Sequence, residues 1–358
     1  MSEYNIGKSI ADVSAAAGEQ QIHKLSSNEN PFGASPLAQR AITDTLASLN
    51  YYPPRTDSAI TEALAAHFGR GLTAANFVTG NGAVDLINLL ENACFESAQS
   101  NSVVICPPCF GSYAATAKLK GATVIEHPLN PETFELELEG LQAAITDDTR
   151  LLYLCNPNNP TGSYFDQASL QRVLDILPAH VTLVYDEVYY HYATEFEMPD
   201  ALGAVLEGAN LVILHSFSKA YGLAGLRMGY AIASEAIIAK LSARKLSFQN
   251  DSVSLAAMQA ALGDTEFLAK TVDNNTEQRA WLREQMSQLG LKFWPSQANF
   301  ICFEAPAGRS AADIVERLIS FGVMVRGAFI YPITFVSASA CPPPMSDLSR
   351  RCSKLWQR

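Results

Sequence analysis

A lysine flanked by hydroxyl side chains follows one of the apolar runs of this sequence. The run at 211–215 leads into Ser216, Ser218 and Lys219, and Arg227 follows eight residues after the lysine. A lysine amine can attack an aldehyde, and hydroxyls with an arginine suit a phosphate group. A lone lysine is more simply explained as a surface residue, so this interpretation depends on what accompanies it.

Four other apolar runs end in residues of different chemical types. A glycine turn and a helical pattern from Val84 follow the run at 77–79, Phe110 follows 103–106, an Asn-Pro segment with Asn159 follows 151–155, and Asp186 and Tyr189 follow 181–185. Taken one at a time, these features are typical of a tight turn, a core aromatic ring, a bare loop and a helix cap. In a parallel sheet, however, the carboxyl ends of the strands meet at one edge, where ligands bind.

The five strand ends together fit the chemistry of a phosphorylated aromatic aldehyde. Lys219 would form an imine with the aldehyde, and Asp186 would keep a ring nitrogen protonated. Tyr189 and Asn159 would hold the ring oxygen, while the glycine turn, the hydroxyls and Arg227 would hold the phosphate. We therefore expect one ligand to contact all five strand ends.

Short runs rich in Val, Ile and Leu alternate with helix-like stretches over the first two thirds of the chain. Runs of this kind without clean alternation predict strands covered on both faces, and helices of about 10–15 residues between them predict a mostly parallel sheet. The predicted strands are 77–79, 103–106, 123–126, 151–155, 181–185 and 211–215, and the predicted helices before them are 35–49 and 58–68. The fold class is therefore α/β.

The pattern changes after about residue 245. A helical stretch over 254–288 is followed by an apolar run at 300–303, a helical pattern over 310–321 and a further run at 323–325. These elements predict a second, smaller α+β domain. Two domains also suit a chain of 358 residues, at about 100–200 residues per domain.

Composition and charge disfavour several classes of protein. A net charge of −11 and an isoelectric point near 5 disfavour binding to nucleic acid, and no apolar run reaches the roughly 18–20 residues of a membrane span. The first residues lack the basic start and apolar stretch of a secretory signal. The sequence has seven cysteines, of which Cys106 and Cys109 form a CxxC motif with two prolines between them. No second CxxC pair accompanies it. We expect no metal site, reduced thiols and a cytoplasmic protein.

Eight motifs spread over residues 25–327 carry a family resemblance. They are LSSNENPFG (25–33), NYYPP (50–54), TGNGAVDLI (79–87), CNPNNPTG (155–162), YDEVY (185–189), SFSKAYGLAGLRMGY (216–230), ANFICF (298–303) and GVMVRG (322–327). The sequence resembles the fold-type I, class I/II aminotransferases that use pyridoxal 5′-phosphate, and among these it is most similar to the histidinol-phosphate aminotransferases. The resemblance implies a large domain with a mostly parallel sheet flanked by helices and a smaller α+β domain.

The resemblance assigns roles to individual residues. Lys219 would bind the aldehyde of the cofactor and move a proton between substrate and cofactor, and Asp186, Tyr189 and Asn159 complete the predicted catalytic set. The predicted cofactor-binding residues are Ala83, Val84, Phe110, Asn159, Asp186, Tyr189, Ser216, Ser218, Lys219, Arg227 and Tyr52. Asn30 and Arg326 are the predicted substrate-binding residues, with Arg326 toward a phosphate or acid group.

The resemblance also predicts how the chain is organised. Residues 1–34 would be an N-terminal arm and part of the small domain, 35–245 the large cofactor-binding domain, and 246–358 the small domain with an atypical tail from 334. Tyr52 resembles the tyrosine of this family that reaches the phosphate in the neighbouring subunit. The resemblance therefore implies a homodimer with shared active sites.

The tail departs from the family pattern. Members of the family that this sequence resembles have an arginine in a C-terminal strand, in a Leu-Arg-Ile-Ser-x-Gly context. This arginine binds the α-carboxylate of the substrate in a bidentate manner. Residues 334–341 read TFVSASAC instead, three prolines end by residue 344, and we predict no such strand there. Arg350 and Arg351 are unsuited as replacements in so proline-rich a context.

We hypothesise that the residues from about Ile333 or Thr334 onward come from a shifted reading frame, either natural or a sequencing error. Codons for Phe-Val-Ser-Ala-Ser-Ala-Cys can be chosen so that the frame one base earlier reads Leu-Arg-Ile-Ser-Ile-Gly-Leu, and the next residues then give Pro-Ala-Ala-Asn-Glu. The alternative is a divergent tail that ends differently. Resequencing the gene decides between them, because an intact frame without a single-base insertion or deletion relative to close relatives rules out the shift.

The resemblance predicts transfer of the amino group of L-histidinol phosphate to 2-oxoglutarate, giving imidazole acetol phosphate and L-glutamate in histidine biosynthesis. An aromatic or broad-specificity aminotransferase and a lyase like threonine-phosphate decarboxylase are alternatives on the same scaffold. A further alternative, favoured only by the tail, is a protein that binds the cofactor but is inactive.

Overall fold

The computed structural model describes residues 22–95, 100–328 and 333–337, and for residues 328 and 333–337 it describes the backbone alone. The predicted arm before residue 22 and the tail after residue 337 lie outside the described residues.

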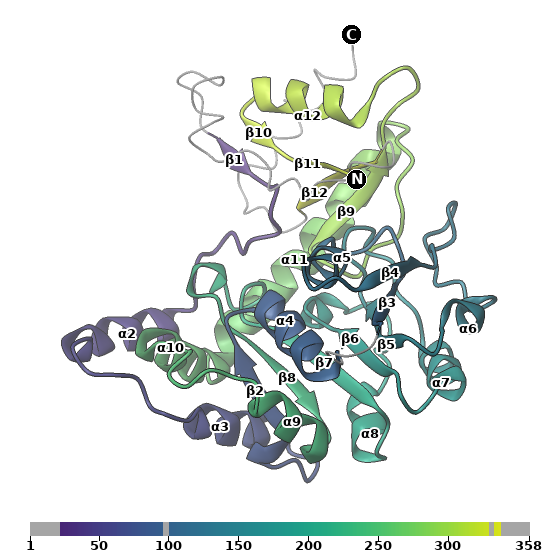
Figure 1. Cartoon of the computed structure of the whole chain (residues 1–358). Helices are drawn as coiled ribbons and strands as arrows, with labels where there is room; N and C mark the ends of the chain where they lie inside the picture. The colour runs from purple at the N-terminus through teal and green to yellow at the C-terminus, as the bar shows by residue number, and fades with distance from the viewer. Residues whose placement is uncertain (1–21, 96–99, 329–332, 338–358) are drawn as a thin grey trace.

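A seven-stranded sheet forms the centre of the large domain (Figure 1). Its strands are β2 (Phe77–Gly80), β3 (Ser102–Ile105), β4 (Thr123–Glu126), β5 (Thr149–Cys155), β6 (Thr182–Asp186), β7 (Leu211–Ser216) and β8 (Gly229–Ala233), in the order β2-β8-β7-β6-β5-β3-β4. Neighbours from β7 to β4 pair in parallel, while β8 runs antiparallel to both of its neighbours. The six predicted strands are confirmed to within two residues at each end, and so is the mostly parallel α/β sheet.

Strand β8 is the one in this sheet that the sequence pattern did not predict. Three of its five residues are glycine or alanine, so it lacks the apolar bulk that marked the other strands. Because it lies between β2 and β7, its Gly229 pairs with Gly80 on one side and with Ser216 on the other. Through these paired residues, the glycine turn after β2 lies next to the segment that carries Lys219.

Helices cover both faces of the sheet (Figure 1). Those with buried side chains in the core on one face are α2 (Pro36–Thr45), α3 (Ser58–Phe68), α7 (Gln167–Ile176), α8 (Ala201–Leu206) and α10 (Ser252–Leu262), and those on the other face are α4 (Ala83–Cys94), α5 (Ser112–Leu119) and α9 (Glu235–Ser242). A short helix, α6 (Leu141–Ala144), precedes β5. Along β6, Leu183 and Tyr185 enter the first core and Val184 the second. Asp186 continues this alternation and therefore faces the side that α5 covers.

The helical stretch predicted over 254–288 is two helices. Helix α10 ends at Leu262, and α11 (Thr265–Gln288) begins after Gly263 and Asp264. The side chain of Asp264 accepts a hydrogen bond from the Phe267 amide and caps α11, and it also accepts one from the Ser35 hydroxyl at 2.5 Å. Since Ser35 is the N-cap of α2, one carboxylate fixes the starts of two helices.

The described residues also form a smaller α+β unit. It holds a three-stranded antiparallel sheet in the order β11 (Arg326–Ala328), β12 (Ile333–Ser337) and β9 (Phe300–Glu304), together with α12 (Ala311–Ser320). The N-terminal strand β1 (His23–Lys24) pairs in parallel with β10 (Val323–Met324), and the chain then crosses to α2 in the large domain (Figure 1). Side chains of β9, β10, α11 and α12 form a separate core.

The expectation that no strand follows residue 333 was wrong for residues 333–337. Their backbone forms β12, which pairs with β9 from Ile333 to Ser337 and with β11 over three residues. Ile, Thr, Phe and Val are residues with high strand propensity, and pairing of the backbone does not require the family's sequence. The strand nevertheless contains no arginine.

Helix α10 belongs to the core of the large domain. Leu255, Met258 and Leu262 are buried with side chains of α2 and α3. We therefore propose that the large domain extends to Gly263 rather than to residue 245.

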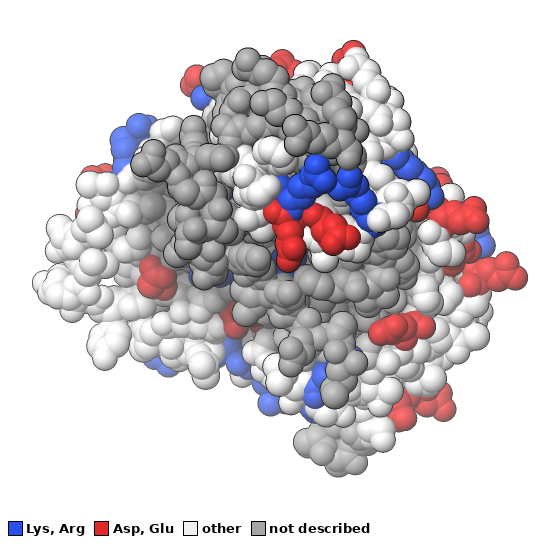
Figure 2. Space-filling view, turned by 90° about the horizontal axis from the view of Figure 1, so that it is seen from above, with Lys and Arg blue, Asp and Glu red and all other residues white. Residues whose placement is uncertain are grey.

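The surface of the described residues is mixed in charge. On the face shown in Figure 2, basic and acidic side chains adjoin each other near the centre, and no continuous basic face is seen among the described residues. Across the described ranges, no helix is long and apolar enough to cross a membrane.

The segment after Lys219 packs tightly against the N-terminal crossing. Gly222 has a φ of +70°, and a Cβ placed there would lie 1.9 Å from the carbonyl oxygen of Gly33. The Ser35 amide also donates to the Tyr221 carbonyl at 3.2 Å. The crossing at 33–35 is thus held on the turn that carries the lysine.

We predict that Gly222→Ala destabilises the protein more than a glycine substitution with the same backbone strain and no collision. Gly208 is the matched control, since its φ is +90° and open space surrounds its Cβ position. Gly208→Ala should cost about 1 kcal/mol and Gly222→Ala at least about 2 kcal/mol, measured as shifts in thermal unfolding midpoint. Equal midpoints for the two variants would contradict the contact with Gly33.

Candidate active site

Lys219 lies in the turn that follows β7, under the N-terminal crossing. Its Nζ donates a hydrogen bond to the backbone carbonyl of Ser27 at 3.0 Å. Burial lowers the pKa of Lys219 to about 8, against the charge of Glu29, which raises it, and with the nearby charges of Arg227, Lys24 and Arg326, which lower it further. The amine is therefore available as a neutral nucleophile at mildly alkaline pH.

Asp186 is the last residue of β6, on the strand beside β7. It is 3% exposed, and its Oδ2 accepts a hydrogen bond from the Tyr113 hydroxyl at 2.6 Å while Oδ1 accepts one from the Val188 amide at 3.0 Å. Burial raises the pKa of Asp186 to about 6, although both hydrogen bonds and the charge of Lys219 lower it. The carboxylate is thus poised to pair with a protonated ring nitrogen.

Tyr189 lies beside Lys219, whose Nζ is 5.5 Å from the centre of the tyrosine ring. The Tyr189 oxygen accepts hydrogen bonds from the amides of Asn159 at 3.2 Å and Asn28 at 3.3 Å. Burial raises the pKa of Tyr189, so the phenol keeps its proton. With both lone pairs engaged by the two asparagines, that proton is left to donate to a ligand oxygen.

An anion cradle lies between the glycine turn, α4 and Arg227. Helix α4 begins at Ala83 after Gly82, which offers no side-chain cap, so the amides of Ala83 and Val84 point out of the first turn. A Cβ at Gly82 would lie 2.6 Å from Nη2 of Arg227, so only glycine leaves room for the guanidinium there. These groups suit a phosphate.

Ser216 and Ser218 border the same cradle. Ser216 pairs with Gly229 at the end of β7, and its Oγ accepts a hydrogen bond from the Ser218 amide at 3.1 Å. Both serines are buried. Their hydroxyls therefore lie at the strand end that the sequence predicted for the phosphate.

Phe110 lies in the loop after β3, partly buried. Its ring packs edge-on against Tyr113, with ring centres 5.5 Å apart at 84°. Tyr113 in turn donates to Asp186. The predicted stacking ring and the predicted ring-nitrogen partner are therefore fixed by the same tyrosine.

The predicted substrate residues differ in their surroundings. Arg326 begins β11, and its charge acts on the Lys219 amine, which places it on the site side of the small domain. Asn30 donates to the Ala220 carbonyl at 2.8 Å and to the Thr271 hydroxyl at 3.1 Å, while its oxygen accepts from the Phe32 amide. The role of Asn30 in substrate binding stays a prediction. Its hydrogen bonds indicate that it fixes the position of Ala220, the residue after Lys219.

A buried pair behind the site ties the ends of β6 and β7 together. His215 and Glu187 share a hydrogen bond of 2.8 Å, and His215 also bonds the Tyr230 hydroxyl at 2.9 Å. Burial raises the pKa of Glu187 and lowers that of His215, so the pair is neutral near pH 7. It fixes the strand ends that carry Asp186 and Lys219 without adding charge.

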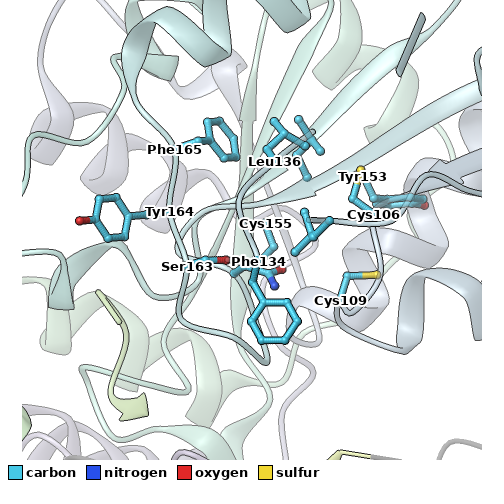
Figure 3. Close-up of a pocket in the computed structure, with 12 residues that line it drawn as sticks. Cys106, Cys109, Phe134, Leu136, Tyr153, Cys155, Ser163, Tyr164 and Phe165 are labelled. Carbon is cyan, nitrogen blue, oxygen red and sulfur yellow. The ribbon is translucent and has the colours of Figure 1, made fainter. Parts of the chain in front are cut away.

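A small cavity lies behind the asparagine loop (Figure 3). Figure 3 shows Cys106 and Cys109 from the loop after β3 and Cys155 from the end of β5 beside it, with Phe134 and Phe165 among the other lining residues. Its volume of about 20 Å³ suits about one water molecule and no cofactor. Elsewhere too, the described residues offer no group of three or more His, Cys, Asp or Glu side chains that could hold a metal ion.

The residues present fit a phosphorylated pyridine aldehyde. One buried carboxylate, one amine of lowered pKa, one proton-donating phenol and a cradle with an arginine and free helix amides lie at neighbouring strand ends. The family model of the class I and II aminotransferases matches residues 20–338. The chain belongs to this family.

Individual relatives agree with this membership. The chain is 37% identical to a histidinol-phosphate aminotransferase of Geobacillus sp. (strain WCH70), over 90% of this chain and 86% of the relative. It is 36% identical to one of Halalkalibacterium halodurans, over 92% and 88%. A crystal structure of histidinol-phosphate aminotransferase from Sinorhizobium meliloti in complex with pyridoxal-5′-phosphate is 25% identical, with a TM-score of 0.88 over 99% of this chain and 96% of that one. The predicted fold class and aminotransferase family are confirmed.

The structure brings most of the predicted site residues together. Lys219, Asp186, Tyr189, Asn159, Ser216, Ser218 and Arg227 lie at strand ends β5 to β8, with Ala83, Val84 and Phe110 beside them. Tyr52 is apart from this group, 86% exposed in the loop after α2. Asn28 and Tyr113 contact predicted site residues but were not predicted themselves.

Proposed function

We propose that this protein is a pyridoxal-phosphate-dependent aminotransferase that transfers the amino group of L-histidinol phosphate to 2-oxoglutarate, giving imidazole acetol phosphate and L-glutamate. The observation that carries the proposal is the position of a half-buried amine of lowered pKa at Lys219, in the turn after β7, together with a buried carboxylate at Asp186, at the end of the neighbouring strand β6. The names of the relatives at 36–37% identity support the donor.

The chain's own residues divide the work. When bound, the cofactor supplies an aldehyde that accepts the amino group and a ring that draws electrons from the α-carbon of the substrate. Asp186 holds the proton on the ring nitrogen, and Tyr189 donates to the ring oxygen. Lys219 Nζ, whose pKa is lowered to about 8 by burial, would take the proton from the α-carbon of the donor and deliver it to C4′ of the cofactor. Phe110 covers one face of the ring.

Two groups orient the phosphates. Arg227, the first amides of α4 and the hydroxyls of Ser216 and Ser218 hold the phosphate of the cofactor. Arg326 contacts the phosphate of the donor, because its charge acts on the lysine from the small domain. One cation from each domain would hold one phosphate each, so the donor would be fixed with its amino group toward the aldehyde.

A half-reaction tests this proposal. Protein loaded with pyridoxal 5′-phosphate is mixed with L-histidinol phosphate, and the visible spectrum should change to that of the amino form of the cofactor with release of imidazole acetol phosphate. Addition of 2-oxoglutarate should restore the first spectrum. A larger kcat/KM for phenylalanine, or release of CO₂ from threonine phosphate, would instead favour the alternatives on this scaffold.

The pH dependence of cofactor capture follows from the lowered pKa of Lys219. A neutral amine is the nucleophile, and its fraction grows as the pH rises toward about 8. The rate at which cofactor-free protein captures pyridoxal 5′-phosphate should rise about tenfold per pH unit below 8 and level off above it. Nα-acetyl-lysine, with an ordinary pKa of about 10.4, is the control and should keep rising beyond pH 9. A protein rate that rises as the control does would contradict the assignment.

The tail sets a second prediction. The family match ends at residue 338, and β12 lacks the arginine that family members use for the substrate carboxylate. Replacing the residues from Phe335 with the frame-restored sequence that begins Leu-Arg-Ile-Ser should raise kcat/KM for 2-oxoglutarate by about 10²–10³-fold. Affinity for the cofactor should change little. Equal kcat/KM for both tails would show that another group binds the carboxylate. If the protein with its own tail binds the cofactor but shows no turnover, the inactive alternative is favoured.

We also propose a homodimer that shares its active sites and acts in the cytoplasm. Apolar side chains are exposed in the loop after α2 and around residue 248; they are Leu46, Leu49, Tyr51, Tyr52, Leu246 and Phe248. Exposed apolar groups of this kind are typical of an interface, and the five described cysteines are free thiols, as in a reducing compartment.

Subunit mixing tests the shared site. Sedimentation should give a dimer, and mixing Lys219→Ala protein with Tyr52→Phe protein should recover activity, because a mixed dimer contains one intact site. A monomer, or a mixture no more active than its parts, would contradict the shared arrangement.

A further inference from the structure

We infer that Tyr113 is a positioning residue for Asp186, whose hydroxyl keeps that carboxylate ionised and aimed at the ring nitrogen of the cofactor. This inference rests on the proposed function, in which Asp186 faces that nitrogen. Tyr113 belongs to none of the motifs that carry the family resemblance.

The hydroxyl of Tyr113 donates a hydrogen bond to Oδ2 of Asp186 at 2.6 Å, and it also shares a side-chain hydrogen bond with the Cys155 thiol. Tyr113 is fully buried on α5, on the face of the sheet toward which Asp186 points. A buried phenol that donates to a carboxylate forms a strong, charge-assisted hydrogen bond. Burial raises the pKa of Tyr113, so the phenol keeps its proton and remains the donor.

Packing holds the Tyr113 ring in the orientation that this bond requires. Tyr153 stacks on one side, with ring centres 4.6 Å apart at 10°, and Phe110 packs edge-on at 5.5 Å. The hydroxyl cannot swing away without displacing two aromatic rings. The same ring that orients Asp186 therefore also fixes the stacking Phe110.

Asp186 needs such a donor because few other groups favour its charge. The ionisable groups that face it are Tyr113 from α5, Cys155 from β5, Glu187 and Tyr189 after β6, and Lys219 after β7. Burial raises the pKa of Asp186 to about 6. The charge of Lys219 lowers it, but that charge is lost as the amine deprotonates near pH 8 or binds an aldehyde. Removing the Tyr113 hydroxyl would leave the hydrogen bond from the Val188 amide and raise the pKa of Asp186 further.

Tyr113→Phe removes only the hydroxyl and keeps the ring packing. Tyr153→Phe is the matched control, since it also deletes a buried phenolic hydroxyl, one that donates to Glu91 at 3.2 Å instead of Asp186. Full-length protein is freed of cofactor, and binding is measured for pyridoxal 5′-phosphate and for its carbocyclic analogue with C–H in place of the ring nitrogen. Thermal unfolding and near-ultraviolet circular dichroism verify that both variants fold.

We expect Tyr113→Phe to weaken binding of pyridoxal 5′-phosphate about tenfold at pH 7 and to approach the wild type by pH 9, where Asp186 ionises without help. Binding of the carbocyclic analogue should change less than about twofold, because it has no nitrogen for Asp186 to hold. Infrared spectra of the cofactor-free variant should show a protonated Asp186 at a pH where the wild-type residue is ionised. Tyr153→Phe should reproduce none of these changes.

Two results would overturn the inference alone. Both presuppose that wild-type protein binds pyridoxal 5′-phosphate more tightly than the analogue. The first is that Tyr113→Phe loses the same affinity for both ligands, and the second is that its loss of affinity for pyridoxal 5′-phosphate does not depend on pH. If wild-type protein binds neither ligand, or binds both equally, the proposed function fails and this inference fails with it.

Discussion

The rest of this structure depends on one constraint. Two ionisable groups of opposite charge, Lys219 and Asp186, are shielded from water at adjacent strand ends. Burial lowers the pKa of Lys219 and raises that of Asp186, so the two values approach neutrality from opposite directions. An amine that is not fully charged can attack and carry a proton, and a carboxylate that is hard to solvate seeks a protonated partner. The chemistry proposed here uses both properties.

The surrounding fold can be understood as the means of keeping these groups buried. The N-terminal crossing covers the lysine through the Ser27 carbonyl, and Gly222 lets that crossing pack against the lysine turn. The neutral His215–Glu187 pair ties the two strand ends together behind the site. The positive charge that a phosphate needs is kept at the cradle, where the Arg227 guanidinium lies beside Gly82.

Much of this site could be predicted from the sequence because it lies at strand ends. An apolar run followed by a polar residue is visible locally, which is why Lys219, Asp186, Tyr189 and Asn159 were found together. Asn28 was missed because its contact with Tyr189 joins residues 161 positions apart. Tyr113 was missed because, on a helix, it has the appearance of a core aromatic residue, and only the fold brings its hydroxyl to Asp186. Strand β8 was missed because it lacks apolar bulk. Strand β12 was missed because residues 333–337 carry no family motif, whereas backbone pairing tolerates many sequences.

The most direct test of this account is to trap the amine that binds the cofactor. Protein loaded with pyridoxal 5′-phosphate is reduced with borohydride and digested, and the labelled peptide is identified by mass spectrometry. The account predicts a single label on the ε-nitrogen of Lys219. A label on another side chain, or no label in protein that has bound the cofactor, would contradict it.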